Sequence, residues 1–279
     1  MKNTNFAFFG TPDVASHTLD MLLEAGYIPK VIITSPDAHS GRGMHLSETP
    51  VSKWAQDHNI HCLKPEKIDA VFIEEFKKLD INISIVVAYG KILPETLIKV
   101  PSLGTINIHY SLLPMYRGAS PLEQALLHGD TVTGVTIQQM AFKLDSGDIL
   151  AKKEIAIDID DTKEALRSKL IKIGGETLIK ILPSIVDGSI MSEPQDESLA
   201  THCTKIKKED GEIDPNGDPT KNYNKYRAFF GWPGVFFFKN NKRVKITKAR
   251  YENNSFIIER VIPEGKKEIS YEDFLKSNI

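Results

Sequence analysis

The feature that most constrains the fold is a strand–helix–strand pattern at the start of the chain, followed by a strongly apolar run. Residues 6–9 are predicted to form a strand, Asp13 to cap a helix that ends near Ala25, and residues 27–34 to form a second strand. Residues 81–88 are almost continuously apolar and rich in β-branched side chains, which is typical of a central parallel strand. The pattern predicts an α/β fold with a mostly parallel sheet and helices on both faces. The turn at Gly10 lacks the G-x-G-x-x-G pattern, so NAD or FAD is not expected.

Three polar side chains fall at predicted strand ends or turns, where open α/β sheets bind ligands. Asn107 and His109 alternate at the end of an apolar run, so on an extended backbone they point the same way, and Asp145 lies in a later turn. Amide and imidazole N–H groups can stabilise the oxyanion of acyl transfer to an amine, and a carboxylate or imidazole can accept the amine proton. A buried polar network that braces two loops is the alternative explanation of the same residues.

The ordered motifs in this region resemble those of a known enzyme family. Asn107-Ile108-His109 is followed by Ser111-Leu112-Leu113-Pro114-Met115-Tyr116-Arg117-Gly118, and later by Asp145-Ser146-Gly147-Asp148. This signature resembles that of the folate-dependent formyltransferases, among which the methionyl-tRNA formyltransferases are the most similar group. The resemblance implies that the first domain has a Rossmann-like α/β fold and that Asn107, His109 and Asp145 are catalytic. It also implies 10-formyltetrahydrofolate as co-substrate, initiator methionyl-tRNA as acceptor, and no metal.

The resemblance further implies which segments hold the folate. The predicted folate-binding residues are Ser111, Leu112, Leu113 and Pro114 in the signature loop, and Ala88, Tyr89, Gly90 and Ile92 in the turn after the central strand. Backbone amides and an apolar wall in that turn would suit a pterin ring, which has a hydrogen-bonding edge and two flat faces. The alternative for this turn is a simple strand-to-helix connection with Tyr89 in the core.

Residues 35–49 are predicted to form a long polar loop around Gly41, Arg42 and Gly43. Loops of this length in compact domains are usually functional or disordered, and an arginine suits phosphate binding. The loop resembles the tRNA-contacting insertion of the methionyl-tRNA formyltransferases, so these three residues are predicted to contact tRNA. A merely solvated loop is the alternative.

A basic run marks the C-terminal part of the chain. Residues 221–250 contain nine Lys and Arg residues and no Asp or Glu, although the whole chain has a net charge of −2. Aromatic residues interleave with these cations, as in small barrels that bind nucleic acid, although the aromatics could equally form the core of a small β domain. Tyr251 to Glu264 has fewer strands than the family leads us to expect, so the OB-like barrel is predicted to be shortened. The tRNA-binding residues predicted here are Lys207, Lys242, Arg243 and Lys245.

Length and composition define the overall organisation. The 279 residues suggest two domains. Residues 161–182 are predicted to form a long amphipathic helix that ends before Pro183, and the loss of periodicity after it predicts a linker at 187–204. The linker follows a catalytic domain at 1–186, and the resemblance implies a basic OB-like domain at 205–279. Cys62 and Cys203 form no metal or redox motif, and no apolar run approaches the roughly 20 residues that span a bilayer. Because the start of the chain also lacks the pattern of a signal peptide, we expect a cytoplasmic protein that is a monomer and binds no membrane.

Two other functions compete with formylation of methionyl-tRNA. One is an N-formyltransferase that uses the same folate donor and an amino-sugar nucleotide as acceptor, which predicts no use for the Arg42 loop or the basic run. The other is an RNA-binding module without catalysis, which predicts no use for Asn107, His109 and Asp145.

Overall fold

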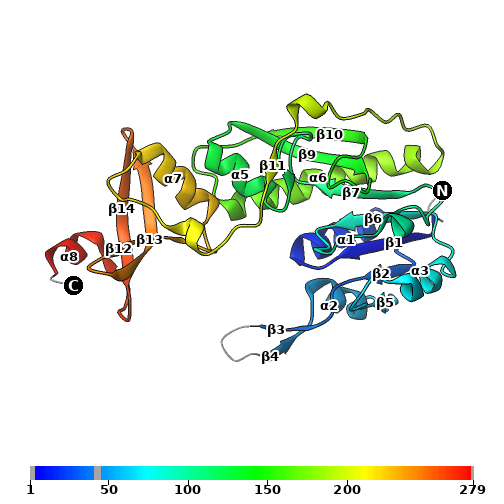
Figure 1. Cartoon of the computed structure of the whole chain (residues 1–279), viewed down its shortest axis with the longest axis horizontal. Coiled ribbons are helices and arrows are strands. Elements are labelled where there is room, and N and C mark those ends of the chain that lie inside the picture. The colour runs from blue at the N-terminus through cyan, green and yellow to red at the C-terminus, as the bar shows by residue number, and fades with distance from the viewer. Residues whose placement is uncertain (1–3, 41–44, 278–279) are drawn as a thin grey trace. The chain divides into compact units, whose positions relative to one another are not determined.

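The computed structural model describes residues 4–40 and 45–277, which form two compact units that alternate along the chain. The first unit contains the residues up to 117, 134–154 and 169–201, and the second contains 118–133, 155–168 and the residues from 202 onward. The chain is shown in Figure 1. Because the units interleave in sequence, the linear boundaries at 186 and 205 stay a prediction.

The first unit is built on a mostly parallel sheet. Its strands are β1 (Phe6–Gly10), β2 (Val31–Ile33), β5 (Cys62–Leu63), β6 (Ile83–Val87) and β7 (Thr105–His109), with β9 (Val132–Gln139) and β10 (Ile149–Ala156), which extend into the second unit. The strand order is β10-β9-β7-β6-β1-β2-β5. The pairs from β5 to β7 are parallel, and β9 is antiparallel to β7. The predicted α/β sheet is confirmed.

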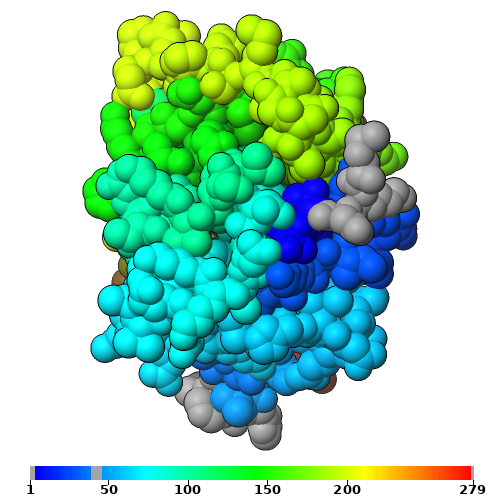
Figure 2. Space-filling view, turned by 90° about the vertical axis from the view of Figure 1, so that its right-hand side faces the viewer, coloured from blue at the N-terminus to red at the C-terminus, as the bar shows by residue number. Residues whose placement is uncertain are grey.

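Helices cover both faces of this sheet because both faces of its central strands are apolar. The helices are α1 (Asp13–Glu24), α2 (Pro50–Asp57), α3 (Ala70–Lys77), α4 (Glu95–Ile98) and α6 (Lys163–Val186), whose first turns belong to the second unit. On β1, Phe6 and Phe8 pack with α1, α2 and α6, whereas Ala7 and Phe9 pack with α3 and α4. Figure 2 shows a face of this unit on which residues near α3 (cyan) and near the end of α6 (yellow-green) both reach the surface.

Local sequence explains where several of these helices begin. Thr49 caps α2 by accepting a hydrogen bond from the Ser52 amide, and Asp69 caps α3 in the same way. Helix α6 continues past Pro183, where the sequence predicted its end. Buried Leu182 and Ile185 flank this proline and anchor the last turn in the core.

Short elements complete the first unit. They are the paired strands β3 (Ala38–Ser40) and β4 (His45–Ser47), the strand β8 (Arg117–Gly118), which ends in the second unit, and the 3-10 helix η1 (Glu197–Leu199). The predicted polar loop at 35–49 thus contains a two-stranded ribbon. The predicted tRNA contacts Gly41, Arg42 and Gly43 lie outside the described residues.

The second unit combines short helices with a small antiparallel sheet. Its elements are α5 (Pro121–His128), β11 (His202–Cys203), η2 (Glu209–Gly211), α7 (Pro219–Ala228), β12 (Val235–Lys239), β13 (Lys242–Glu252), β14 (Ser255–Pro263), β15 (Ile269–Ser270) and α8 (Tyr271–Lys276). The sheet has the order β12-β13-β14-β15, and in the described part of the chain its two edge strands do not pair with each other. The predicted small β structure at the C-terminus is therefore confirmed, and it forms an open antiparallel sheet instead of a closed OB-like barrel. Among the described residues, no helix is both long and apolar enough to cross a membrane.

Candidate active site

The strand β7 carries two of the predicted catalytic residues on one side. Ile106 and Ile108 point into the core shared with α1 and α6, so the alternating Asn107 and His109 project from the opposite face of the strand. His109 is the last residue of β7 and is buried, whereas Asn107 is half-buried. Both residues lie toward the carboxyl end of a parallel strand, where α/β sheets bind their ligands.

Hydrogen bonding fixes the orientation of the His109 ring. Its Nε2 atom lies 2.9 Å from the main-chain oxygen of Tyr116. Because a carbonyl oxygen only accepts hydrogen bonds, Nε2 carries a hydrogen and Nδ1 is left to face the site. Nδ1 lies 3.7 Å from Oδ1 of Asp145. The structure thus brings the imidazole and the carboxyl group together, although they are 36 positions apart in the chain.

Asp145 is held in its turn by further contacts. Its backbone adopts a left-handed conformation, with φ of 49°, which is strained for a residue other than glycine. Its Oδ1 accepts a hydrogen bond of 2.9 Å from Nε2 of Gln138. Gln138 is buried on β9 directly opposite Asn107, so the amide, the imidazole and the carboxyl group belong to one cluster.

The signature loop after β7 is braced from within. The Ser111 hydroxyl donates to the main-chain oxygen of Met115 at 2.6 Å, and the Thr136 hydroxyl joins the oxygen of Ser111 to the amide of Leu113. Ser111, Leu113 and Pro114 are buried, whereas Leu112 is half-buried. Of the four predicted folate residues in this loop, Leu112 therefore has the most accessible side chain, and the Ser111 hydroxyl braces the loop.

In the turn after β6, the residues on either side of Tyr89 are exposed to solvent, whereas the Tyr89 side chain is buried. The Tyr89 ring is buried edge-on against Phe9, with the ring centroids 5.5 Å apart, and burial raises the pKa of its hydroxyl to about 12. Ala88 and Gly90 are exposed and have positive φ values of 47° and 82°, and a Cβ added at Gly90 would meet open space. Ile92 beyond them is 85% exposed. An exposed, strained backbone and an apolar side chain fit the edge and face of a pterin ring.

The register of the sheet places this turn beside the catalytic cluster. Val86 on β6 pairs with Asn107 on β7, so Ala88 and His109, each two residues further on, leave the sheet at the same edge. The Thr11 hydroxyl donates to the main-chain oxygen of Tyr89 at 2.9 Å, which ties the end of β1 to this turn. Strands β1 and β6 are neighbours at the point where the strand order reverses, which is the usual ligand crevice of such sheets.

Three polar residues that support Asp145 were not predicted from the sequence as part of the site. They are Gln138, Gln195 and the fully buried Arg117. A polar residue inside the apolar run at 132–140 could have signalled Gln138. Gln195 carried no such signal, because it lies in the stretch taken for a linker, where periodicity is lost.

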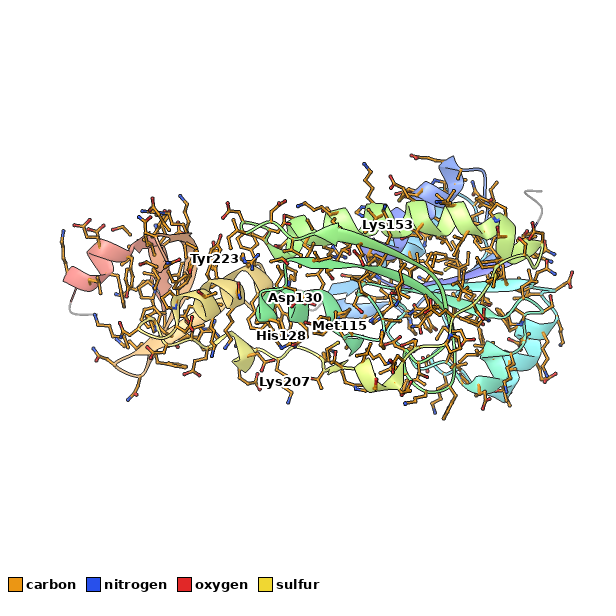
Figure 3. The ribbon with its side chains drawn as sticks, turned by 90° about the horizontal axis from the view of Figure 1, so that it is seen from above. Met115, His128, Asp130, Lys153, Lys207 and Tyr223 are labelled. Carbon is orange, nitrogen blue, oxygen red and sulfur yellow. The ribbon has the colours of Figure 1, made fainter. Side chains whose placement is uncertain are left out.

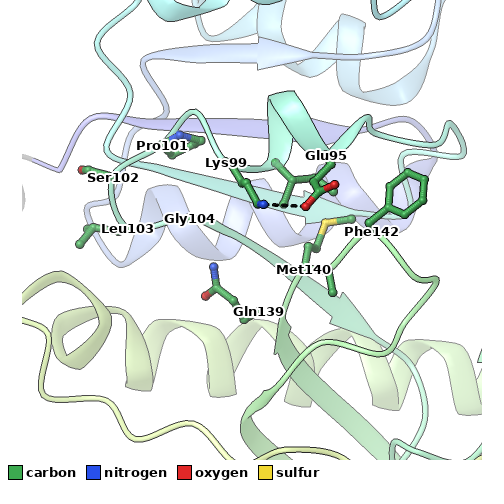
Figure 4. Close-up of a pocket in the computed structure, with 11 residues that line it drawn as sticks. Glu95, Lys99, Pro101, Ser102, Leu103, Gly104, Gln139, Met140 and Phe142 are labelled. Carbon is green, nitrogen blue, oxygen red and sulfur yellow. Dashed lines mark ion pairs between the residues drawn. The ribbon is translucent and has the colours of Figure 1, made fainter.

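A cavity of about 570 Å³ lies at the other end of β7 (Figure 4). Its wall includes Gly104 just before β7 and the segment from Gln139, the last residue of β9, to Phe142, and an ion pair of 2.6 Å joins Lys99 to Glu95. The lining of this cavity includes none of the three predicted catalytic residues. Within the described ranges, no group of three or more His, Cys, Asp or Glu residues could hold a metal ion.

Several basic residues of the second unit make contacts within the unit. Arg227 is buried and donates to main-chain oxygens of Asp158 and Asp161. Lys248 and Arg250 both contact Glu259, at 2.8 and 2.5 Å. These three cations therefore serve the unit itself, so the charge offered to a partner is smaller than the sequence suggested.

The predicted tRNA-binding residues of the second unit differ in exposure. Lys207 and Lys242 are exposed, and Lys207 extends away from the ribbon (Figure 3), whereas Arg243 and Lys245 are half-buried. On the sheet, Lys245 lies opposite Phe236 and Arg243 lies opposite Phe238, so these four side chains share one face.

Comparison with known proteins gives family matches over most of the chain. The model of the formyl transferase family matches residues 4–182, and that of the formyl transferase C-terminal domain matches 205–257. A methionyl-tRNA formyltransferase from Geobacter metallireducens is 36% identical over 99% of this chain and 96% of its own length.

Two solved structures share the fold at low sequence identity. The methionyl-tRNA formyltransferase from Clostridium thermocellum has a TM-score of 0.64 and 17% identity, covering 96% of this chain and 99% of the other. An N-formyltransferase from Helicobacter canadensis, in complex with folinic acid and dTDP-3-aminofucose, has a TM-score of 0.70 and 18% identity, covering 96% and 98%. On the family models and the full-length relative, the chain belongs to the methionyl-tRNA formyltransferase family of folate-using formyl transferases.

Proposed function

We propose that this chain transfers the formyl group of 10-formyltetrahydrofolate to the α-amino group of methionine on initiator tRNA. The observation that carries the proposal is the approach of Asp145 to within 3.7 Å of His109 Nδ1, at the strand edge that also bears Asn107. This cluster combines a neutral hydrogen-bond donor with a proton-transfer pair and needs no Ser or Cys nucleophile.

Each residue of the cluster has a distinct role in the proposal. The amine attacks the formyl carbon of the bound folate, the bond from this carbon to the folate nitrogen then breaks, and tetrahydrofolate leaves with a proton equivalent to the one that the amine has lost. The Asn107 amide donates a hydrogen bond to the developing oxyanion, since it faces the site from the middle of a rigid strand. The His109 ring is oriented by its Nε2 hydrogen bond to Tyr116, so only Nδ1 can exchange a proton at the site. Asp145 faces that atom and takes up the amine proton, directly or through the ring.

The folate is held beside this cluster by the segments that leave the same edge of the sheet. The exposed main chain of Ala88 and Gly90 binds the polar edge of the pterin, while Ile92 and Leu112 supply apolar contacts. Tyr89, Ser111, Leu113 and Pro114 support these segments from the interior.

The tRNA is held by the face of the C-terminal sheet that bears Phe238, Arg243 and Lys245, together with Lys207, Lys242 and the predicted contacts Gly41, Arg42 and Gly43. The Arg243 guanidinium lies 5.0 Å from the centre of the Phe236 ring, and Phe238 beside it is 53% exposed. A cation next to an exposed aromatic ring suits a nucleic acid backbone and its unpaired bases.

Replacing Lys245 tests this face. Lys245→Ala should raise KM for charged tRNA and leave kcat unchanged, because a phosphate contact is lost away from the chemistry. The slope of log affinity against log salt should fall by roughly 0.7–0.9, the amount expected for one phosphate contact. Filter binding and initial rates over a salt series measure both quantities.

The matched control is Lys248→Ala on the same strand, whose ammonium group is held by Glu259. It should change the salt slope much less than Lys245→Ala does. Equal salt slopes for the two variants and the wild type would contradict the proposal that this face of the sheet binds tRNA. A salt-independent KM for the wild type would favour the amino-sugar nucleotide as acceptor instead.

A further inference from the structure

Gln195 makes a complete set of hydrogen bonds around the turn that carries Asp145. Its Nε2 donates to the main-chain oxygens of Asp145 and Gly147, at 2.9 and 2.7 Å. Its Oε1 accepts from Nε and Nη2 of Arg117, at 3.0 and 2.7 Å. Both amide hydrogens and both oxygen lone pairs are therefore used, so the side chain has one favourable orientation.

Arg117 fixes which end of the amide faces the turn. The guanidinium is fully buried and can only donate, so it must meet the oxygen of Gln195, which leaves the NH₂ group for the two carbonyl oxygens. The charge of Arg117 is balanced by Glu197 at 2.7 Å. Hydrogen bonds from Arg117 and then from Lys143 lower the pKa of Glu197 to about 2, so this carboxylate stays charged at neutral pH.

The same carboxylate holds the turn from its other side. Glu197 also contacts Lys143 at 2.7 Å, and Lys143 lies two positions before Asp145. Contacts thus hold the turn on both sides: Glu197 contacts the side chain of Lys143 before Asp145, and Gln195 donates to the main-chain oxygens of Asp145 and Gly147. Such restraint supports the left-handed backbone conformation of Asp145, which is less favourable for an aspartate than for glycine.

We propose that Gln195, oriented by Arg117, is a positioning residue that holds the Asp145 turn so that its carboxyl group faces His109. This inference rests on the proposed function and deepens it, since Gln195 acts only through Asp145. Catalytic geometry tolerates little displacement, and a shift of about 1 Å can cost roughly 100-fold in rate.

The test is a double-mutant cycle in the full-length chain between Gln195→Glu and Asp145→Asn. Gln195→Glu keeps the shape and can still accept from Arg117, but it turns an oxygen toward the carbonyl oxygens of Asp145 and Gly147. We expect kcat to fall by roughly 30- to 100-fold, while KM for the folate and for charged tRNA changes by less than about threefold. In the Asp145→Asn background the same change should alter kcat by less than about twofold, because the group it positions has been removed.

Three outcomes would overturn the inference: kcat within about twofold of the wild type for Gln195→Glu, a loss confined to KM, or losses that multiply in the double variant. Asp196→Asn is the matched control, since its exposed side chain accepts hydrogen bonds from Ser198 and should leave kcat unchanged. Thermal melting checks folding. If Gln195→Glu melts early, Gln195→Ala, which adds no charge, undergoes the same cycle and is judged by the same criteria. Failure of the proposed function is a different result, in which the wild type itself forms no formylmethionyl-tRNA.

Discussion

Asp145→Asn is expected to lower kcat by roughly 10²–10⁴-fold, the range found when a general acid or base is removed. Asparagine can still accept the hydrogen bond from Gln138, so the turn should keep its conformation. What is lost is the carboxylate that faces Nδ1 of His109 and that we propose as the acceptor of the amine proton. Steady-state formylation of charged initiator tRNA at saturating folate measures the effect, and KM for tRNA should change little.

The matched control for this prediction is Asp80→Asn. Asp80 has the same φ of 49° as Asp145, but it lies before the amino end of β6, at the edge of the sheet opposite to the cluster. Its replacement should leave kcat unchanged. If both variants turned over like the wild type, Asp145 would have no part in the chemistry.

Asn107→Ala is expected to lower kcat by roughly 10²–10³-fold, as removal of one oxyanion donor does in other acyl transfers. The side chain projects from a strand that is fixed by Ile106 and Ile108 in the core, so the donor is preorganised. Single-turnover rates with bound folate report the chemical step directly.

Asn107→Asp separates hydrogen-bond donation from shape. It keeps the size of the side chain but replaces the NH₂ donor by an acceptor next to a developing negative charge, so its loss should equal or exceed that of alanine. An aspartate variant with near wild-type turnover would remove the oxyanion role from this position.

Much of the fold followed from residue patterns. The alternation of Phe6, Ala7, Phe8 and Phe9 between two cores is a consequence of the strand period, and the apolar run at 81–88 became the central strand β6. The prediction that α6 ends before Pro183 was wrong, because it relied on proline as a local signal for the end of a helix. There the burial of Leu182 and Ile185 outweighs the lost hydrogen bond.

The site was predictable only in part, for a physical reason. Asn107 and His109 are close in sequence and share a strand face, so their proximity follows from local geometry. Asp145 meets His109 only because β9 returns antiparallel to β7, and Gln195 meets Asp145 across 50 positions of chain. Contacts between residues so far apart depend on tertiary packing. No periodicity in the segment around Gln195 records them, and the motif of Asp145 was recognisable only by resemblance.

In the C-terminal sheet, ion pairs reduce the number of cations that are available to a partner. Nine cations between residues 221 and 250 suggested a uniformly basic surface. Lys248 and Arg250 instead meet Glu259 on the neighbouring strand β14, which lies beyond the counted run. The face with Phe238, Arg243 and Lys245 thereby becomes the more specific prediction for RNA contact.

The most direct test of the central claim is one formylation assay with three acceptors. Purified chain and 10-formyltetrahydrofolate are mixed in parallel with charged initiator tRNA, charged elongator tRNA or an amino-sugar nucleotide, and tetrahydrofolate release is followed together with the formylated product. The account predicts rapid product formation with charged initiator tRNA, much slower formation with the elongator, and none with the sugar nucleotide. Formylation of the sugar nucleotide alone would contradict the acceptor, and no formylated product from any acceptor would contradict the enzyme.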